Sequence, residues 1–271
     1  MHIDLHTHTN VSDGKLSPDA LVQRAVANGV EILSITDHDT VDAYNQIANE
    51  NKSIRLIPGI EFSTFWNKTG IHIVGLNVNL NSVALKEAVT HQHHARRMRA
   101  EAIAERLEKL GVKDALTGAQ QIAGNDNIGR PHFARHLVNT GMATTINHAF
   151  DKYLDAKSAD IKKFWATLPR IISWIRDAGG MAILAHPLKY KFTRTKLLEL
   201  LEDIIEAGGH GMEVISGKQL AHETTDLARI CQQKNLLASC GSDFHQPDRH
   251  WSDLGKYPPL PKDCKPVWEY F

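Results

Sequence analysis

The chain has 271 residues, of which 42% are hydrophobic and 23% are charged, so its composition is that of an ordinary globular protein. Lysine plus arginine number 31, as do aspartate plus glutamate. The resulting net charge of zero argues against a surface built for long DNA or for anionic membranes.

The sequence carries no signal of membrane insertion or export. No apolar run approaches the length of about 18 residues that a transmembrane helix needs. The N-terminus has no basic region followed by an apolar stretch, which predicts no signal peptide. The cysteines number three and form no closely spaced pair, as is typical of a reducing compartment. We therefore expect a cytoplasmic protein without a membrane partner.

Short apolar runs alternate with helical patterns along the chain. Helical patterns such as 18–28 and 195–207 are each followed by glycine, the residue preferred just beyond a helix. The alternation predicts a parallel α/β architecture, either open or closed into a barrel. The expected strands cover 3–8, 32–37, 55–62, 71–78, 181–185, 212–215 and 236–240.

The alternation stops between about residues 85 and 165. A long polar helix is expected over 91–110, and two shorter helical patterns fall within 118–141. We expect a small helical insert over 86–165, with 1–85 and 166–271 forming the α/β domain.

Histidines and carboxylates recur at or near the ends of successive expected strands, in a chain with 16 histidines. His6 and His8 lie two residues apart on a strand, so their side chains point to one face. Asp243 and His245 repeat this spacing at the last strand. The other members of the pattern are Asp13, His38, Glu61, His72 and His186.

Each of these residues alone has a structural explanation, such as a turn at Asp13 or a hydrogen-bonded strand histidine. Together they require a further explanation, because gathering so many ionisable groups at one end of a sheet costs free energy unless a cation is bound there. All the donors are nitrogen or oxygen, and six imidazoles with three carboxylates suffice for two or three metal ions. Such a cluster can generate hydroxide near neutral pH and bind phosphoryl oxygens, which favours hydrolysis of a phosphate ester.

The order of these residues resembles that of the polymerase and histidinol phosphatase (PHP) superfamily. The resemblance covers essentially the whole chain and implies a distorted (β/α)7 barrel with a trinuclear metal site. It implies that His6, His8, Glu61 and Asp243 hold one metal ion. The resemblance further implies a second ion held by Glu61, His72 and His186, and a third held by Asp13, His38 and His245. Manganese (Mn2+) is the expected metal, with iron (Fe2+) or zinc (Zn2+) as alternatives.

The segment 129–135, Gly-Arg-Pro-His-Phe-Ala-Arg, resembles the branch of the superfamily that hydrolyses nucleoside 3′,5′-bisphosphates or trims short RNA in the 5′ to 3′ direction. This resemblance implies that Arg130 and His132 bind substrate phosphate. A guanidinium and a helix N-terminus both suit that role. We expect Arg130 and His132 to act in catalysis together with Asp243 and His245. The alternative for Arg130 is a residue that only begins a surface helix.

Other substrate contacts are expected from the same branch. Lys189 and Tyr190 follow His186 in a segment that resembles it. Residues 155–161 depart from the branch pattern, which has a Gly-Lys-Pro-Ala-Tyr-Val-like stretch, and Lys157 is the basic residue that could replace its lysine.

The leading hypothesis is a metal-dependent phosphatase that removes the 3′-phosphate of a nucleoside 3′,5′-bisphosphate by hydroxide attack on phosphorus. A 5′ to 3′ exoribonuclease acting on short 5′-phosphorylated RNA is the alternative with the same chemistry. Two further alternatives are a histidinol-phosphatase-like enzyme and a non-catalytic metal-binding module. The oligomeric state is open.

We expect one basic segment to have a structural role instead. His91, His93 and His94 with Arg96, Arg97 and Arg99 are predicted to form the solvated face of a surface helix.

Overall fold

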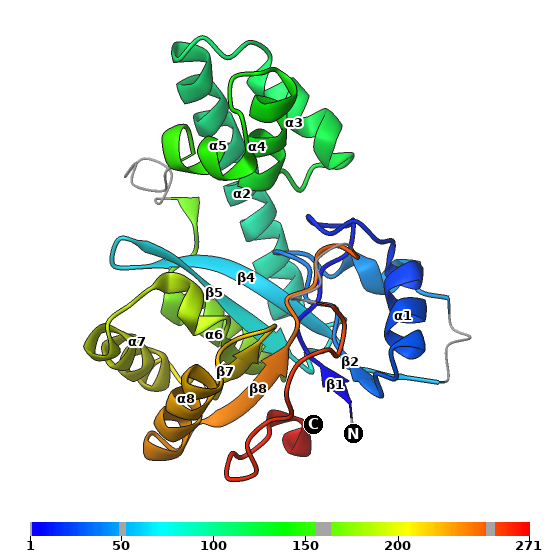
Figure 1. The fold of residues 1–271 in the computed structure, drawn as a ribbon, viewed down its shortest axis with the longest axis vertical. Coiled ribbons are helices and arrows are strands. Elements are labelled where there is room, and N and C mark those ends of the chain that lie inside the picture. The colour runs from blue at the N-terminus through cyan, green and yellow to red at the C-terminus, as the bar shows by residue number, and fades with distance from the viewer. Residues whose placement is uncertain (1, 49–52, 155–163, 248–252) are drawn as a thin grey trace.

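The computed structural model describes residues 2–48, 53–154, 164–247 and 253–271, which form an α/β fold (Figure 1). The strands are β1 Ile3–Asp4, β2 Ile32–Leu33, β3 Arg55–Leu56, β4 Gly59–Trp66, β5 Thr69–Leu76, β6 Met181–Leu184, β7 Gly211–Ser216 and β8 Leu237–Gly241.

The strands form two sheets. β1, β2 and β3 make a parallel three-stranded sheet, and β4 to β8 follow one another in a five-stranded sheet. β5 runs antiparallel to both β4 and β6, whereas β6, β7 and β8 are parallel. The expected α/β class is therefore confirmed. The strand pairing of the expected (β/α)7 barrel is not, because these ladders mix parallel and antiparallel strands and do not form a closed barrel.

The two sheets meet at two seams, which we define by their backbone hydrogen bonds. At the first, Asp243 N–H donates to His6 O (2.9 Å) and His8 N–H donates to Phe244 O (2.9 Å). At the second, Asp39 N–H donates to Glu61 O (2.9 Å). The segments that leave β1, β2 and β8 thus come together with β4, and they carry much of the predicted metal site.

The single strand expected over 55–62 is in fact two strands. Pro58 separates β3 from β4, and proline cannot donate a ladder hydrogen bond. The break sends β3 into one sheet and β4 into the other.

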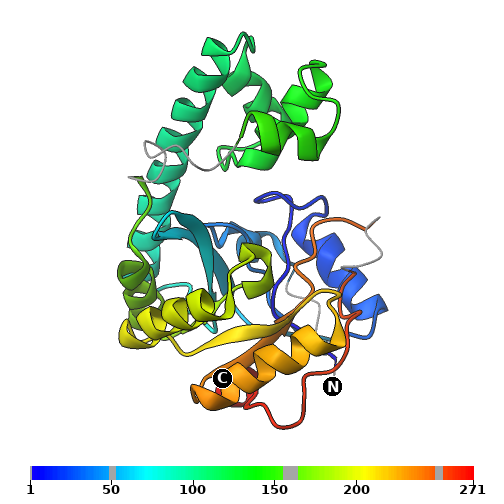
Figure 2. The same cartoon turned by 60° about the vertical axis from the view of Figure 1, so that its left-hand side comes forward.

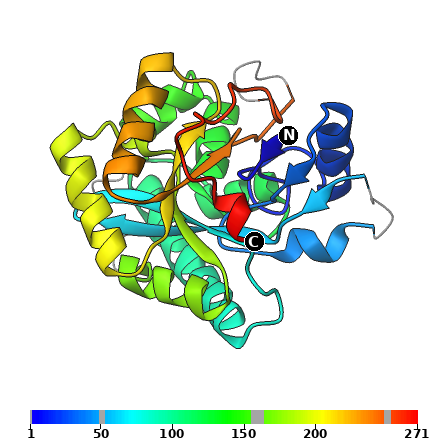
Figure 3. The ribbon, with the colours of Figure 1, turned by 90° about the horizontal axis from the view of Figure 1, so that it is seen from below.

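Helices cover the outer side of the strands, as the view from below makes clear (Figure 3). α6 and α8 contact the five-stranded sheet, and α1 packs beside the first sheet through Leu21 and Leu33. The helices of this part are α1 Pro18–Ala27, α6 Leu168–Asp177, α7 Arg194–Glu206 and α8 Ala221–Gln233.

A group of four helices stands on one side of the sheets (Figure 2). α2 Val83–Lys109 extends from the sheets into this group, which has its own apolar core around Leu107, Phe133 and Leu137. The remaining helices are α3 Ala115–Ala123, α4 Arg130–Asn139 and α5 Ile146–Lys152. Among the described residues, no helix is both long and apolar enough to cross a membrane.

Candidate metal centre and phosphate pocket

All nine side chains predicted as metal ligands converge at the seams of the two sheets. His6 and His8 follow β1 and are fully buried, and their Nε2 atoms lie 3.1 Å apart. Asp243 comes from beyond β8, with its Oδ1 3.3 Å from His8 Nε2 and 3.6 Å from His6 Nε2.

Glu61, on β4, lies at the centre of the cluster. Its Oε2 is 3.3 Å from the Nε2 atoms of both His6 and His8, while its Oε1 is 2.9 Å from His72 Nδ1 and from His186 Nε2. Burial raises the pKa of Glu61, but the surrounding histidines lower it well below its usual range. One carboxylate therefore faces two sets of imidazoles, as a bridging ligand would.

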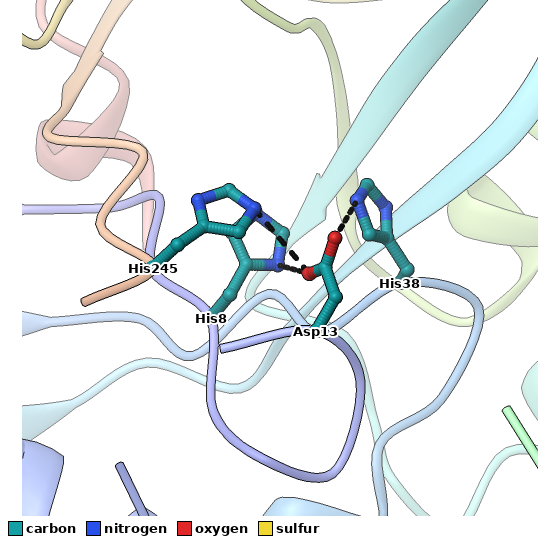
Figure 4. A group of neighbouring side chains, drawn as sticks. All are labelled: His8, Asp13, His38 and His245. Carbon is teal, nitrogen blue, oxygen red and sulfur yellow. Dashed lines mark ion pairs between the residues drawn. The ribbon is translucent and has the colours of Figure 1, made fainter. Parts of the chain in front are cut away.

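Asp13 gathers a second group of imidazoles (Figure 4). Its carboxylate lies 3.3 Å from His245 Nε2, 3.8 Å from His38 Nε2 and 4.0 Å from His8 Nδ1. Burial raises the pKa of Asp13, and the nearby His245 and His38 lower it well below its ordinary value.

The donor set fits divalent metal ions. Glu61 Oε2, Asp13 Oδ1 and His8 Nδ1 are buried without a hydrogen-bond partner among the described residues. A buried polar atom left in this state is costly, and a cation shared by these atoms removes the cost. Four groups of three or four of these side chains hold ligand atoms within 4.8 Å of one another. That they bind metal ions, and in which grouping, stays a prediction.

Two of the clustered residues have backbone conformations that are rare outside glycine. His186 has φ of 29° and Asp243 has φ of 52°. Such strained positions persist where the surrounding structure fixes them, and they occur often at functional sites.

Glu213, on β7, is a member of the site that the sequence analysis missed. Its carboxylate lies 2.6 Å from His6 Nδ1 and accepts a 2.6 Å hydrogen bond from the backbone N–H of His186. Burial raises the pKa of Glu213, but His6 outweighs this and lowers it. A carboxylate of this kind orients a ligand imidazole with Nε2 toward the metal. The sequence feature that could have identified Glu213 is a single acidic residue within an apolar strand, the same feature that identified Glu61.

Lys189 and Tyr190, predicted to contact substrate, lie beside the cluster. The Lys189 ammonium forms an ion pair with Asp243. The Tyr190 hydroxyl donates to Ala185 O (2.9 Å) and accepts from His72 N–H (3.0 Å), so backbone groups already engage it. Lys157 lies outside the described residues.

Arg130 and His132, at the start of α4, line a cavity of about 160 Å³ together with Asp13, His38 and His72. Gly129 N–H donates to His132 Nδ1 (2.9 Å), so the ring proton is on Nε2. Burial is the main reason that the pKa of His132 falls to about 4. His132 is therefore a neutral hydrogen-bond donor at neutral pH.

The helix face expected to be solvated is in part buried, which corrects that prediction. Gln92, Arg96 and Arg99 are spaced by four and three residues on α2, and each is less than 10% exposed. Asp39 accepts hydrogen bonds from Arg96 Nε (2.7 Å) and Gln92 Nε2 (2.8 Å), which ties α2 to the segment that carries His38. Only His91, His93, His94 and Arg97 of the segment are exposed.

Comparison with known proteins agrees with this site. Residues 4–107 match the PHP domain family. The 5′-3′ exoribonuclease Rnm of Escherichia coli (strain K12) is 42% identical, with 98% of this chain and 92% of the relative covered. A 3′,5′-nucleoside bisphosphate phosphatase of Chromobacterium violaceum is 36% identical, with 98% and 95% covered.

A solved structure supports the fold over its full length. It is described as an amidohydrolase from Chromobacterium violaceum with bound sulfate and no metal. It superposes with a TM-score of 0.90 at 35% identity, covering 100% of this chain and 95% of that one. An α/β fold with buried imidazoles and carboxylates at its strand ends defines a hydrolase that uses metal ions. The chain belongs to the PHP-domain family and is a metal-dependent phosphoesterase.

Proposed function

We propose that the chain hydrolyses the 3′ ester of a nucleotide that also carries a 5′-phosphate, with a nucleoside 3′,5′-bisphosphate as substrate. The observation that carries the proposal is the cavity in which Arg130 and His132 face the same space as Asp13, His38 and His72. A substrate with two phosphates can use both sets of residues.

The proposed metal ligands are the nine clustered side chains, and Mn2+ is the proposed ion, with Fe2+ or Zn2+ as alternatives. Metal ions held there would polarise the phosphoryl group and supply hydroxide near neutral pH. The two sheets together correspond to an opened form of the distorted barrel. We assign 86–165 to an insert domain, whose described helices stand beside the site, and 1–85 with 166–271 to the catalytic domain.

The protein's own side chains then have separate tasks. Arg130 binds phosphate oxygens, and His132 donates a hydrogen bond from Nε2 without carrying charge. Lys189 and Tyr190 border the cluster on the side of His186, where Lys189 offsets the charge of Asp243. Water adds to phosphorus, the bond from phosphorus to the 3′ oxygen breaks, and that oxygen takes a proton. The products are a nucleoside 5′-phosphate and inorganic phosphate.

A 5′ to 3′ exoribonuclease activity is the second candidate, favoured by the relative of that name at 42% identity. The same bond breaks in short 5′-phosphorylated RNA, where it releases a mononucleotide and leaves a new 5′-phosphate on the shortened strand. One site serves both substrates.

The test measures phosphate released from adenosine 3′,5′-bisphosphate and mononucleotide released from a 5′-phosphorylated RNA pentamer by the manganese-loaded protein. Both reactions should stop with chelator and in Asp243→Asn. Activity on the pentamer alone would favour the second candidate. Failure of both reactions while the protein holds manganese would overturn the proposal.

A further inference from the structure

Two asparagines in the segment that joins α3 to α4 bind the backbone of the sheet region through their side chains. The Asn125 side-chain amide donates to Asn10 O (3.2 Å) and to Val11 O (3.3 Å), and the Asn127 amide donates to His38 O (2.8 Å). We call residues 125–127 the asparagine latch, because these bonds join the helical group to loops that leave the first sheet. The proposed mechanism gives neither asparagine a task.

The carbonyl groups that the latch binds belong to segments that carry predicted metal ligands. Asn10 and Val11 lie in the loop that runs from His8 to Asp13, and His38 is itself a predicted ligand. The Asp13 carboxylate lies 4.0 Å from His8 Nδ1 and 3.8 Å from His38 Nε2, in the group drawn in Figure 4. The latch therefore contacts two of the segments that build the Asp13 group.

The geometry of the latch is set by its own hydrogen bonds. Asn127 N–H donates to Asn125 Oδ1 (2.8 Å), so the Asn125 amide accepts within the latch through its oxygen and donates across to the loop through its nitrogen. Both ends of this amide are used, which determines its orientation. Gly124, with φ of 69°, ends α3 just before the latch begins.

Asn127 is buried at the boundary between two cavities. It is 9% exposed, and it lines both the cavity of about 160 Å³ at the imidazole cluster and a wider cleft of about 1080 Å³ that α2 and α3 border. Its Oδ1 is buried without a hydrogen-bond partner among the described residues. A leucine of similar shape would avoid the free-energy cost of this unpaired oxygen. The bond from Asn127 to His38 O therefore indicates a role beyond packing.

The His38 segment is held by the helical group from two directions. Asp39, the next residue, accepts the hydrogen bond from Arg96 Nε on α2 (2.7 Å), while Asn127 binds the carbonyl of His38 from the segment before α4. A single attachment would leave the peptide between these residues free to rotate about it. Two attachments on opposite sides of one peptide fix the direction in which the His38 ring leaves the backbone.

We propose that the asparagine latch positions His38 and the loop of Asp13 for metal binding, so that the helical group completes the metal centre. This inference rests on the proposed function, from which it takes the metal ligands. Asn125 and Asn127 are positioning residues in it, because they bind the backbone of the ligand-bearing segments. Partners of this kind orient the ligands of a metal ion and raise its affinity.

The test measures manganese binding by calorimetry on protein freed of metal with chelator. Asn127→Leu keeps the approximate shape of the side chain and removes the amide, and at least one manganese-binding step should weaken by about 10–100-fold. Asn125→Leu should weaken the same step, because both asparagines act on the Asp13 group. Asn139→Leu is the matched control, since Asn139 ends α4 in the same helical group with its side chain exposed, and it should leave every step unchanged.

A spectroscopic measurement distinguishes positioning from a loss of stability. Cobalt(II) replaces manganese as the probe, because its visible absorption depends on the geometry of its ligands. Cobalt-loaded Asn127→Leu should show an absorption band that differs from that of the wild type and of Asn139→Leu. The unfolding temperature of metal-free Asn127→Leu should stay within about 4 °C of the wild-type value.

The outcomes separate this inference from the proposed function. Manganese steps and a cobalt spectrum that are unchanged in both latch variants would overturn it. So would equal weakening of every step together with a large drop in the unfolding temperature of the metal-free variants, which would assign the latch a structural role. If the wild type binds manganese and hydrolyses neither phosphate ester, the proposed function fails while the binding comparison still decides the role of the latch. A wild-type protein that binds no manganese would overturn both.

Discussion

Glu213 makes two hydrogen bonds at the site and His132 is oriented by one, and both residues give testable consequences at the scale of the residue. Glu213 contacts the ring of His6 and the backbone of His186, so one carboxylate positions two predicted ligands. His132 is held by Gly129 N–H in the tautomer that donates from Nε2.

Glu213→Gln should weaken metal binding by about 10–100-fold, which is typical for loss of a carboxylate that orients a ligand histidine. The amide can still accept the hydrogen bond from His186 N–H, so the fold should persist. Manganese affinity is measured by calorimetry on metal-free protein, with Glu206→Gln on the exposed surface of α7 as the control. Unchanged affinity in Glu213→Gln would show that His6 does not need this partner.

The lowered pKa of His132 predicts that the free energy of unfolding depends on pH. Its pKa falls to about 4 in the folded chain, against an ordinary value of 6.5, because burial disfavours the charged ring. The unfolded chain therefore takes up a proton as pH falls below 6.5, while the folded chain does not until about 4. Stability is lost over this window as pH falls, and the loss at pH 5 is about 2 kcal/mol.

Urea unfolding of metal-free protein at pH 7.5 and pH 5 tests this prediction. Wild-type protein should lose about 2 kcal/mol more between these pH values than His132→Gln, which cannot titrate. The other histidines titrate in both proteins and cancel. Equal losses would mean that the His132 ring titrates normally in the folded state.

At the scale of the element, α2 joins the helical group to the site. Arg96 on this helix is paired with buried Asp39, one residue beyond the predicted ligand His38. Asp39 also accepts a 2.8 Å hydrogen bond from the backbone N–H of Ser63 on β4. One carboxylate thus fixes α2, β4 and the His38 segment relative to one another.

Arg96→Met should destabilise the protein by about 3–5 kcal/mol, because Asp39 would remain buried with its charge uncompensated. Denaturant unfolding measures this loss, and Arg97→Met on the exposed face should change stability by less than about 0.5 kcal/mol. Asp39→Asn in the Arg96→Met background should cost little more than Arg96→Met alone. Additive losses in the double variant would show that the two residues are not coupled.

The elements also show what the sequence could and could not predict. The strand-end histidines and carboxylates were recognisable because ionisable residues interrupt apolar runs there. Glu213 also interrupts an apolar run, but it was not among the predicted site residues. Arg99 and Arg97 look alike in the sequence, since only the folded chain places Arg99 buried against the Trp165 ring and leaves Arg97 exposed. The predicted α/β class is confirmed, but the strands of the predicted distorted (β/α)7 barrel pair as two sheets, because Pro58 and the antiparallel β5 change the strand pairing without changing the apolar pattern.

At the scale of the whole molecule, the predicted ligands come from both sheets. His6, His8 and His38 follow strands of the three-stranded sheet, whereas Glu61, His72 and Asp243 belong to or follow strands of the other. Backbone hydrogen bonds join the sheets at their seams, and these side chains converge at the same place. Metal ions bound between these side chains would therefore link the two sheets.

Removing metal should loosen the seams before it affects the helical group. Manganese at 100 times its dissociation constant should stabilise the fold by about 2.7 kcal/mol, and chelator should remove this gain, lowering the unfolding temperature by roughly 5 °C or more. In hydrogen exchange, peptides covering 3–8 and 237–245 should exchange faster with chelator. Peptides of α4 within the helical group provide the internal reference, because its apolar core includes Phe133 and Leu137 and none of the predicted metal ligands. Faster exchange of α4 to the same degree would mean that the ions stabilise the chain as one unit and that the seams are not its weakest part.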